Sequence, residues 1–254
     1  MPTEYEALFF GVIQVLTEWL PISSSGHLAL FQIFLGVGSD ISFDIMLHIG
    51  TLLAVVAFYR SDLFSLFKGV LARDGSQIKL GLFLLASALP TAVIGFAFKA
   101  YFESMFSSTT AIGGAMLITG AALLYASRFN GTGKISLASA FLVGIAQGVA
   151  VAPGISRSGM TISTAIAFGI QKEEAVRFSF LVGIIPLIGA VVLEGRNAVL
   201  ITLEPFSVLL GLATSFLVGY ASIGFLLRVL RNSKLHYFGY YSIAMAFALL
   251  VFIK

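Results

Sequence analysis

Six apolar stretches of this chain are each long enough to cross a lipid bilayer, which takes about 20 residues. They lie near residues 42–59, 80–98, 108–127, 175–193, 206–228 and 236–253. Only 11% of the residues are charged and the mean hydropathy is +1.00, whereas a soluble domain carries about 25% charged residues. Since a backbone in hydrocarbon must satisfy its own hydrogen bonds, we predict an all-α polytopic membrane protein with six full transmembrane helices. Residues 1–254 are expected to form a single integral membrane domain.

Two further regions, 5–38 and 136–170, are apolar but broken. Each contains two short hydrophobic runs separated by a turn rich in proline, glycine and serine, at residues 21–26 and 153–159. Each run is too short to span the bilayer comfortably, so we predict two re-entrant helix pairs. Non-helical backbone persists at membrane depth only where protein buries it or water reaches it. We therefore expect the two turns to face each other or a polar cavity.

The two broken regions align without a gap when the chain is shifted by 133 positions. The shift pairs Gly11 with Gly144, Gln14 with Gln147, Ser23 with Ser156, Ser25 with Ser158 and Gly26 with Gly159, while Ser24 falls on Arg157. A fixed offset that holds through two polar turns indicates a duplication. We predict two repeats, residues 1–127 and 128–254.

Lysine and arginine are distributed unevenly between alternate loops. Eleven lie in residues 60–79, 128–174 and 228–235, against three in the remaining loops and at the C-terminus. The positive-inside rule places the rich loops in the cytoplasm. The first re-entrant pair then enters from outside and the second from inside. This makes the repeats inverted, an architecture with a binding site near the bilayer midplane.

Polar residues gather at the first turn, inside sequence that is otherwise strongly apolar. They are Glu18, Ser23, Ser24, Ser25 and His27. Polar groups are costly in hydrocarbon, so a cluster of them there indicates a functional site.

The two turns share a pattern that favours anion binding. In each, Ser-x-Ser-Gly precedes an apolar run, and serine in that place is an N-cap signal. Helix N-termini carry unpaired N–H groups and a partial positive charge, and Arg157 adds a cation whose fork suits phosphate. We predict a pocket for a phosphate or diphosphate on a lipid whose tail stays in the bilayer. The expected contacts are Ser23, Ser25, Gly26, Ser156, Arg157, Ser158 and Gly159.

Glu18 and His27 indicate chemistry beyond anion binding. A carboxylate repels a nearby phosphate unless a metal intervenes or the carboxylate handles a proton. His27 suits a general acid, a general base or a nucleophile, and a serine of residues 23–25 is an alternative nucleophile. Phosphoryl transfer, achieved mostly by positioning and charge neutralisation, accommodates all of these groups.

The segments TEWLPISSSGHL at residues 17–28 and PGISRSGMTIS at residues 153–163 resemble the two signature motifs of the undecaprenyl-diphosphate phosphatase family, which is linked to bacitracin resistance. The resemblance covers nearly the whole chain, including FDIMLHIGTLLAV at 43–55 and RFSFLVGIIP at 177–186. It implies hydrolysis of C55 polyprenyl diphosphate on the outer face of the plasma membrane, which recycles the carrier lipid for cell-wall glycan synthesis. It also implies a divalent cation, Mg²⁺ or Ca²⁺.

By the same resemblance, Glu18, Ser24 and His27 take part in catalysis, Arg157 holds the diphosphate, and Glu18 is a metal ligand. The family usually has a glutamate where this chain has Gln14. Glutamine offers a carbonyl to a metal but supplies no charge and exchanges no proton. Gln14 and Glu18 lie i, i+4 on one helical face, so Gln14 is a second candidate ligand.

A transporter of polyprenyl phosphate, which would use the same midplane anion site without chemistry, is the alternative function. The repeats are chemically unequal, because Glu18 and His27 fall opposite Val151 and Met160. A symmetric carrier has no need for this inequality, which favours the enzyme.

Other features of the sequence exclude some classes of function. The chain has no cysteine, which excludes disulfides and thiol catalysis. It has no basic patch interleaved with aromatic residues, so we expect no nucleic-acid partner.

We interpret His48 as a satisfied buried histidine. Glycine-rich helix faces allow a homodimer but do not require one.

Overall fold

The computed structural model describes residues 4–35, 41–195, 205–231 and 234–252, and these parts are helical almost throughout. The helices are α1 (Glu4–Trp19), α2 (Ser24–Leu35), α3 (Ile41–Phe58), α4 (Arg60–Leu71), α5 (Gly75–Ala97), α6 (Lys99–Met105), α7 (Thr109–Ala126), α8 (Leu137–Val149), α9 (Arg157–Ala167), α10 (Lys172–Gly195), α11 (Pro205–Arg231) and α12 (Leu235–Phe252). The all-α fold class predicted from the sequence is confirmed.

Helices occupy all six positions expected to span the membrane, namely α3, α5, α7, α10, α11 and α12. Four of them are long and apolar enough to cross on their own within the described residues: α5, α7, α10 and α11. A fifth candidate combines α3 with α4, which are bent by 70° at their junction, while the apolar part of α12 is slightly shorter. By length and composition, the described chain thus has four or five full spans where six were predicted.

Residues 60–79, expected as a loop, contain the helix α4. Leu63 and Leu66 of α4 pack against the hydrophobic core of the molecule, and α4 also contacts α5. Asp74 caps the next helix, since its carboxylate accepts hydrogen bonds of 2.8 Å from both the backbone N–H and the hydroxyl of Ser76. With these contacts, α4 and α5 form a helical hairpin, although the four cations of residues 60–79 are typical of a cytoplasmic loop.

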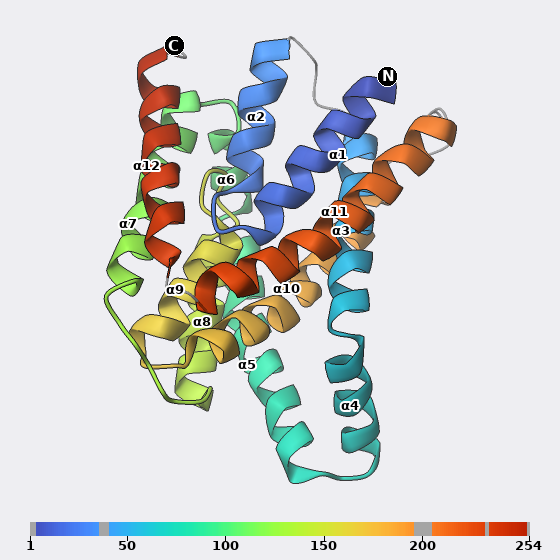
Figure 1. Cartoon of the computed structure of the whole chain (residues 1–254), viewed down its shortest axis with the longest axis vertical. Helices are drawn as coiled ribbons and strands as arrows, with labels where there is room; N and C mark the ends of the chain where they lie inside the picture. The colour runs from blue at the N-terminus through green and yellow to red at the C-terminus, as the bar shows by residue number, and fades with distance from the viewer. Residues whose placement is uncertain (1–3, 36–40, 196–204, 232–233, 253–254) are drawn as a thin grey trace.

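The two broken regions form helix pairs, as expected. α1 and α2 are joined by a turn at residues 20–23, and α8 and α9 by a turn at residues 150–156. Figure 1 shows both turns near the centre of the molecule, with the two described chain ends at one end and the α4–α5 connection at the other.

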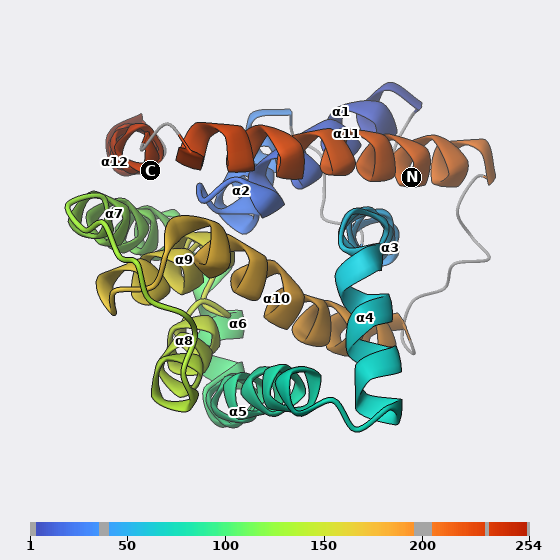
Figure 2. The same cartoon turned by 60° about the horizontal axis from the view of Figure 1, so that its bottom comes forward.

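Each short pair packs against a long helix from the other half of the chain. α1 lies on α11, and α8 lies on α5. Figure 2 shows α11 along one side of the molecule and α5 along the other, with α9 and α10 between them. Gly11 and Gly144, which correspond at the offset of 133 residues, both lie in these contacts: a Cβ atom would lie 3.3 Å from the backbone oxygen of Gly211 at the first and 2.1 Å from that of Ser87 at the second. The short pair of each half thus packs on a long helix of the other half, as expected for a duplicated chain. The inverted relation of the two halves remains a prediction.

The contact at Gly144 leaves no room for a side chain. A Cβ atom there would lie 2.1 Å from the backbone oxygen of Ser87 on α5. We therefore expect Gly144→Ala to lower the thermal unfolding temperature in detergent, because overpacking costs about 1–3 kcal/mol. Gly114→Ala is the matched control, since a Cβ at Gly114 meets nothing within 4 Å. Equal unfolding temperatures for the two variants would contradict this packing.

Candidate functional site

The α1–α2 turn depends on an unusual backbone conformation at Ser23. Its φ of 71° lies in the left-handed region, which is costly for a residue other than glycine and is found at functional sites. The Ser23 hydroxyl accepts a hydrogen bond of 3.3 Å from the backbone N–H of Gly26. Ser23 is thus the N-cap of α2, and Ser24 is the first residue of the helix.

The α8–α9 turn is built in the corresponding way. Ser156 caps α9 by accepting a hydrogen bond of 3.1 Å from the backbone N–H of Gly159, and Arg157 is the first residue of the helix. Gly154 has a φ of 90°, and a Cβ there would lie 2.4 Å from the backbone oxygen of Ile112. Only glycine therefore fits the turn at this point.

Two equivalent serines join the turns to each other. The Ser25 hydroxyl accepts a hydrogen bond of 3.1 Å from the backbone N–H of Gly154. The Ser158 hydroxyl donates in the opposite direction, toward the backbone oxygens of Glu18 at 3.4 Å and Leu20 at 3.3 Å. The expectation that the turns face each other is confirmed.

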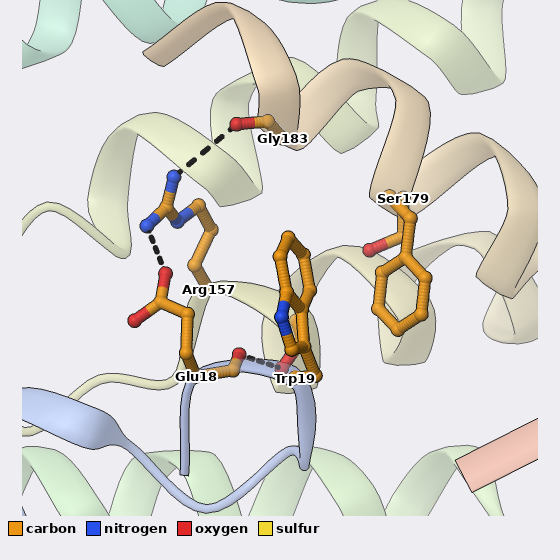
Figure 3. A pocket seen from close by; sticks show the side chains of 7 residues that line it. Glu18, Trp19, Arg157, Ser179 and Gly183 are labelled. Carbon is orange, nitrogen blue, oxygen red and sulfur yellow. Dashed lines mark hydrogen bonds and ion pairs between the residues drawn. The ribbon is translucent and has the colours of Figure 1, made fainter. Parts of the chain in front are cut away.

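The side chains of Glu18, Ser24 and Arg157 converge where the turns meet. Arg157 forms an ion pair with Glu18, and its other terminal nitrogen lies 3.4 Å from the backbone oxygen of Gly183 (Figure 3). The second carboxylate oxygen of Glu18 accepts a hydrogen bond of 2.5 Å from the Ser24 hydroxyl. Because Ser24 and Arg157 begin α2 and α9, two helix N-termini meet beside one carboxylate.

A small pocket opens on this cluster. Its lining consists of Glu18, Trp19, Arg157, Ser158, Ser179, Phe180 and Gly183. The carboxylate side chain is 6% exposed and the guanidinium side chain 25% exposed. The cation is therefore the member of the pair that a ligand reaches more easily.

Gln14 and His48 extend the cluster along α1 and α3. The Gln14 side-chain nitrogen lies 3.4 Å from a Glu18 oxygen and 3.4 Å from Nε2 of His48. The Gln14 side-chain oxygen is buried and has no hydrogen-bond partner. His48, interpreted from sequence as a satisfied buried histidine, is instead only half-buried and lies beside the candidate site. The sequence showed only a histidine within the apolar segment 43–55, and nothing in that segment indicated which residue the histidine would contact.

His27 lies apart from the ion pair. Its Nδ1 is 2.7 Å from the backbone oxygen of Ser23, and its Nε2 is 2.8 Å from the hydroxyl of Tyr241 on α12. Sequence analysis missed Tyr241, which lies in an apolar helix where tyrosine is an ordinary residue.

The donors around Glu18 fit a hard divalent cation only in part. Within the described residues, no three histidine, aspartate or glutamate side chains come together as a metal site. One carboxylate and the unpartnered oxygen of Gln14 are available, and Mg²⁺ is commonly held by one or two carboxylates plus substrate phosphates. The residues therefore suit a cation that arrives with, or is completed by, a phosphorylated ligand.

The predicted site residues thus fall into two groups. Glu18 contacts both Ser24 and Arg157, and Glu18 and Arg157 line the pocket together with Ser158. The remaining expected contacts mostly hold the turns, as caps or as bonds between them: Ser23, Ser25, Gly26, Ser156, Ser158 and Gly159. Their roles toward a ligand remain predictions.

Comparison with known proteins assigns the chain to a family. The model of the family described as bacitracin resistance protein BacA matches residues 7–248. An undecaprenyl-diphosphatase of Korarchaeum cryptofilum is 42% identical, with 96% of this chain and 97% of the relative covered. Proteins of the same name from Alkaliphilus metalliredigens and Methanococcus maripaludis strain C6 are 39% and 38% identical, each covering 98% of this chain and 100% of the relative. The chain belongs to the bacitracin resistance protein BacA family.

Proposed function

We propose that this protein is an integral membrane phosphatase that hydrolyses undecaprenyl diphosphate to undecaprenyl phosphate and inorganic phosphate. This reaction would recycle the carrier lipid for surface glycan synthesis. The observation that carries the proposal is the convergence of Ser24, Glu18 and Arg157 at two helix N-termini. The names of the relatives agree with it.

Arg157 is the proposed binding residue for the diphosphate. Its guanidinium matches phosphate oxygens in a fork, and the N-termini of α2 and α9 add positive partial charge. One terminal nitrogen of Arg157 is paired with Glu18. A phosphate would therefore compete with this carboxylate for the guanidinium.

Ser24 is the proposed nucleophile. Its hydroxyl already donates to Glu18 at 2.5 Å, so Glu18 is placed to take the proton as the serine oxygen bonds to the terminal phosphorus. The bond from that phosphorus to the bridging oxygen breaks, and undecaprenyl phosphate leaves. Water then cleaves the phosphoserine and releases inorganic phosphate. The geometry favours Ser24 over His27, because both ring nitrogens of His27 have other partners.

A divalent cation, Mg²⁺ or Ca²⁺, is the proposed cofactor. Glu18 and the side-chain oxygen of Gln14 would hold it, with the remaining ligands from phosphate and water. When bound, it would neutralise negative charge on the phosphates. Gln14 contributes no charge, so this chain would depend on the substrate for most of its affinity for the cation.

Transport of polyprenyl phosphate without chemistry is the less favoured function. The relatives are named as phosphatases, and the serine–carboxylate contact exists only at the first turn. Val151 stands in place of Glu18 at the second turn, and Arg157 in place of Ser24.

We further propose that the protein lies in the plasma membrane with the site open to the periplasmic or extracellular side. The uneven distribution of lysine and arginine supports this orientation.

Purified protein in detergent should release phosphate from C55 diphosphate in the presence of Mg²⁺ or Ca²⁺. Ser24→Ala and Arg157→Lys should each lower kcat/KM by about 10²-fold, because one removes the nucleophile and the other the planar fork. Ser107→Ala and Arg73→Lys, at exposed positions, are the matched controls and should retain full rate. Wild-type protein that binds the lipid but releases no phosphate would instead favour transport.

Glu18→Gln should abolish turnover yet bind inorganic pyrophosphate about tenfold more tightly in EDTA, since it removes the anion that competes for Arg157. Isothermal titration measures the affinity, with Glu103→Gln, whose side chain is 64% exposed, as the control. Weaker binding by Glu18→Gln would show that the carboxylate supports anion binding and does not oppose it.

The proposed orientation can be tested by labelling, because the chain has no cysteine. In intact cells a membrane-impermeant maleimide should label Ser107→Cys, between α6 and α7, but not Ala72→Cys, at the end of α4. Both positions are exposed. Permeabilised cells should give equal labelling. The reverse pattern in intact cells would overturn the orientation.

A further inference from the structure

His27 is held at both ring nitrogens, although it does not touch the ion pair. The residue is 2% exposed. Its Nδ1 lies 2.7 Å from the backbone oxygen of Ser23, and its Nε2 lies 2.8 Å from the hydroxyl of Tyr241. The imidazole and phenol rings are nearly parallel, with 5° between their planes and 5.6 Å between their centroids.

These two contacts determine which nitrogen carries the hydrogen. A backbone carbonyl only accepts, so Nδ1 must donate to Ser23. In the neutral ring Nε2 then has a lone pair and accepts from the Tyr241 hydroxyl. The Ser23 carbonyl therefore selects the tautomer, and the Tyr241 hydroxyl, which can donate or accept, holds the orientation of the imidazole.

The imidazole in turn stabilises the residue on which the turn depends. Ser23 has the left-handed φ of 71°, and its carbonyl accepts from the backbone N–H of His27 at 3.3 Å as well as from Nδ1. Ser24 follows directly, with its hydroxyl 2.5 Å from Glu18. A ring that pins the Ser23 carbonyl thus fixes where α2 starts and where the Ser24 hydroxyl points.

We propose that Tyr241 is a positioning residue for this site: through His27 it holds the Ser23 carbonyl and so keeps Ser24 against Glu18. The inference rests on the proposed phosphatase function for its kinetic consequence. It also gives the last helix a role in the site at the first turn. Tyr241 lies 214 residues from His27 and is 42% exposed, so it closes the outer side of a buried ring.

Tyr241→Phe tests the proposal, because it keeps the ring and removes only the hydroxyl. We expect kcat for C55 diphosphate to fall about tenfold, since small misplacement of a reacting group is costly, with KM unchanged within about twofold. Tyr240→Phe is the matched control: Tyr240 is the preceding residue of α12, is 60% exposed and contacts the ring of His236. It should behave as wild type.

Nitrogen-15 NMR of protein labelled in histidine provides a readout independent of turnover. The chain has three histidines, and His27→Gln identifies the signal of interest. Wild type should show hydrogen on Nδ1 and a hydrogen-bonded Nε2, and in Tyr241→Phe the Nε2 signal should move toward that of an unbonded ring nitrogen. A purely structural role for the tyrosine would leave this signal unchanged.

His27→Asn provides the rescue test. The asparagine amide places a donor near the position of Nδ1 and has nothing at Nε2. If His27 acts by holding Ser23, this variant should be faster than His27→Ala by about tenfold, and adding Tyr241→Phe should not slow it further.

Each outcome decides between distinct conclusions. An unchanged kcat for Tyr241→Phe, with active wild type, overturns this inference and leaves the phosphatase intact. A higher kcat for Tyr241→Phe also overturns it, since Tyr241 would then be withholding His27 from the substrate. Inactive wild-type protein with the expected NMR signals would overturn the proposed function while leaving the tyrosine–histidine contact established.

Discussion

The contact between Glu18 and Arg157 is the interaction on which the site depends. A buried carboxylate loses its hydration, and a single cation rarely compensates that loss unless further hydrogen bonds satisfy the remaining lone pairs. Here Ser24 and Gln14 approach the second oxygen of Glu18, while the Gly183 carbonyl accepts from Arg157. The pair requires the two turns to lie side by side at the centre of the protein.

The scaffold around that pair is close to symmetric, and the chemistry is not. Ser23 and Ser156 cap α2 and α9 in the same way, and Ser25 and Ser158 each bond to the opposite turn. All four follow the offset of 133 residues. The position between each pair of serines differs, with Ser24 in one turn and Arg157 in the other. The duplicated capping motif thus holds both turns in the same way. The residue between its two serines is the proposed nucleophile, Ser24, in the first copy and the proposed phosphate-binding residue, Arg157, in the second.

These capped turns explain why so many polar residues occur near the site without contacting the ion pair. An anion site built from helix N-termini works only if the helices begin at defined points. Most of the serines satisfy backbone groups of the two turns that would otherwise lack a partner inside the protein. His27 belongs to the same supporting shell, because it holds the carbonyl of the one residue outside glycine that adopts a left-handed conformation in these turns.

Much of the architecture could be derived from sequence, because hydrophobic length and the serine–glycine turns are local signals. They predicted the long helices, the two broken pairs and the meeting of the two turns. The family resemblance supplied the grouping of Glu18, Ser24 and Arg157, and it included His27, which lies apart from the ion pair. The helix α4 was not predicted, because its cations resemble those of a cytoplasmic loop while its leucines pack on the core. Tyr241 and His48 were beyond sequence reasoning for a different reason. Their contacts with His27 and Gln14 join residues 214 and 34 positions apart. Such contacts follow from how helices pack, and the sequence of an apolar helix does not show which residue a tyrosine or histidine in it will contact.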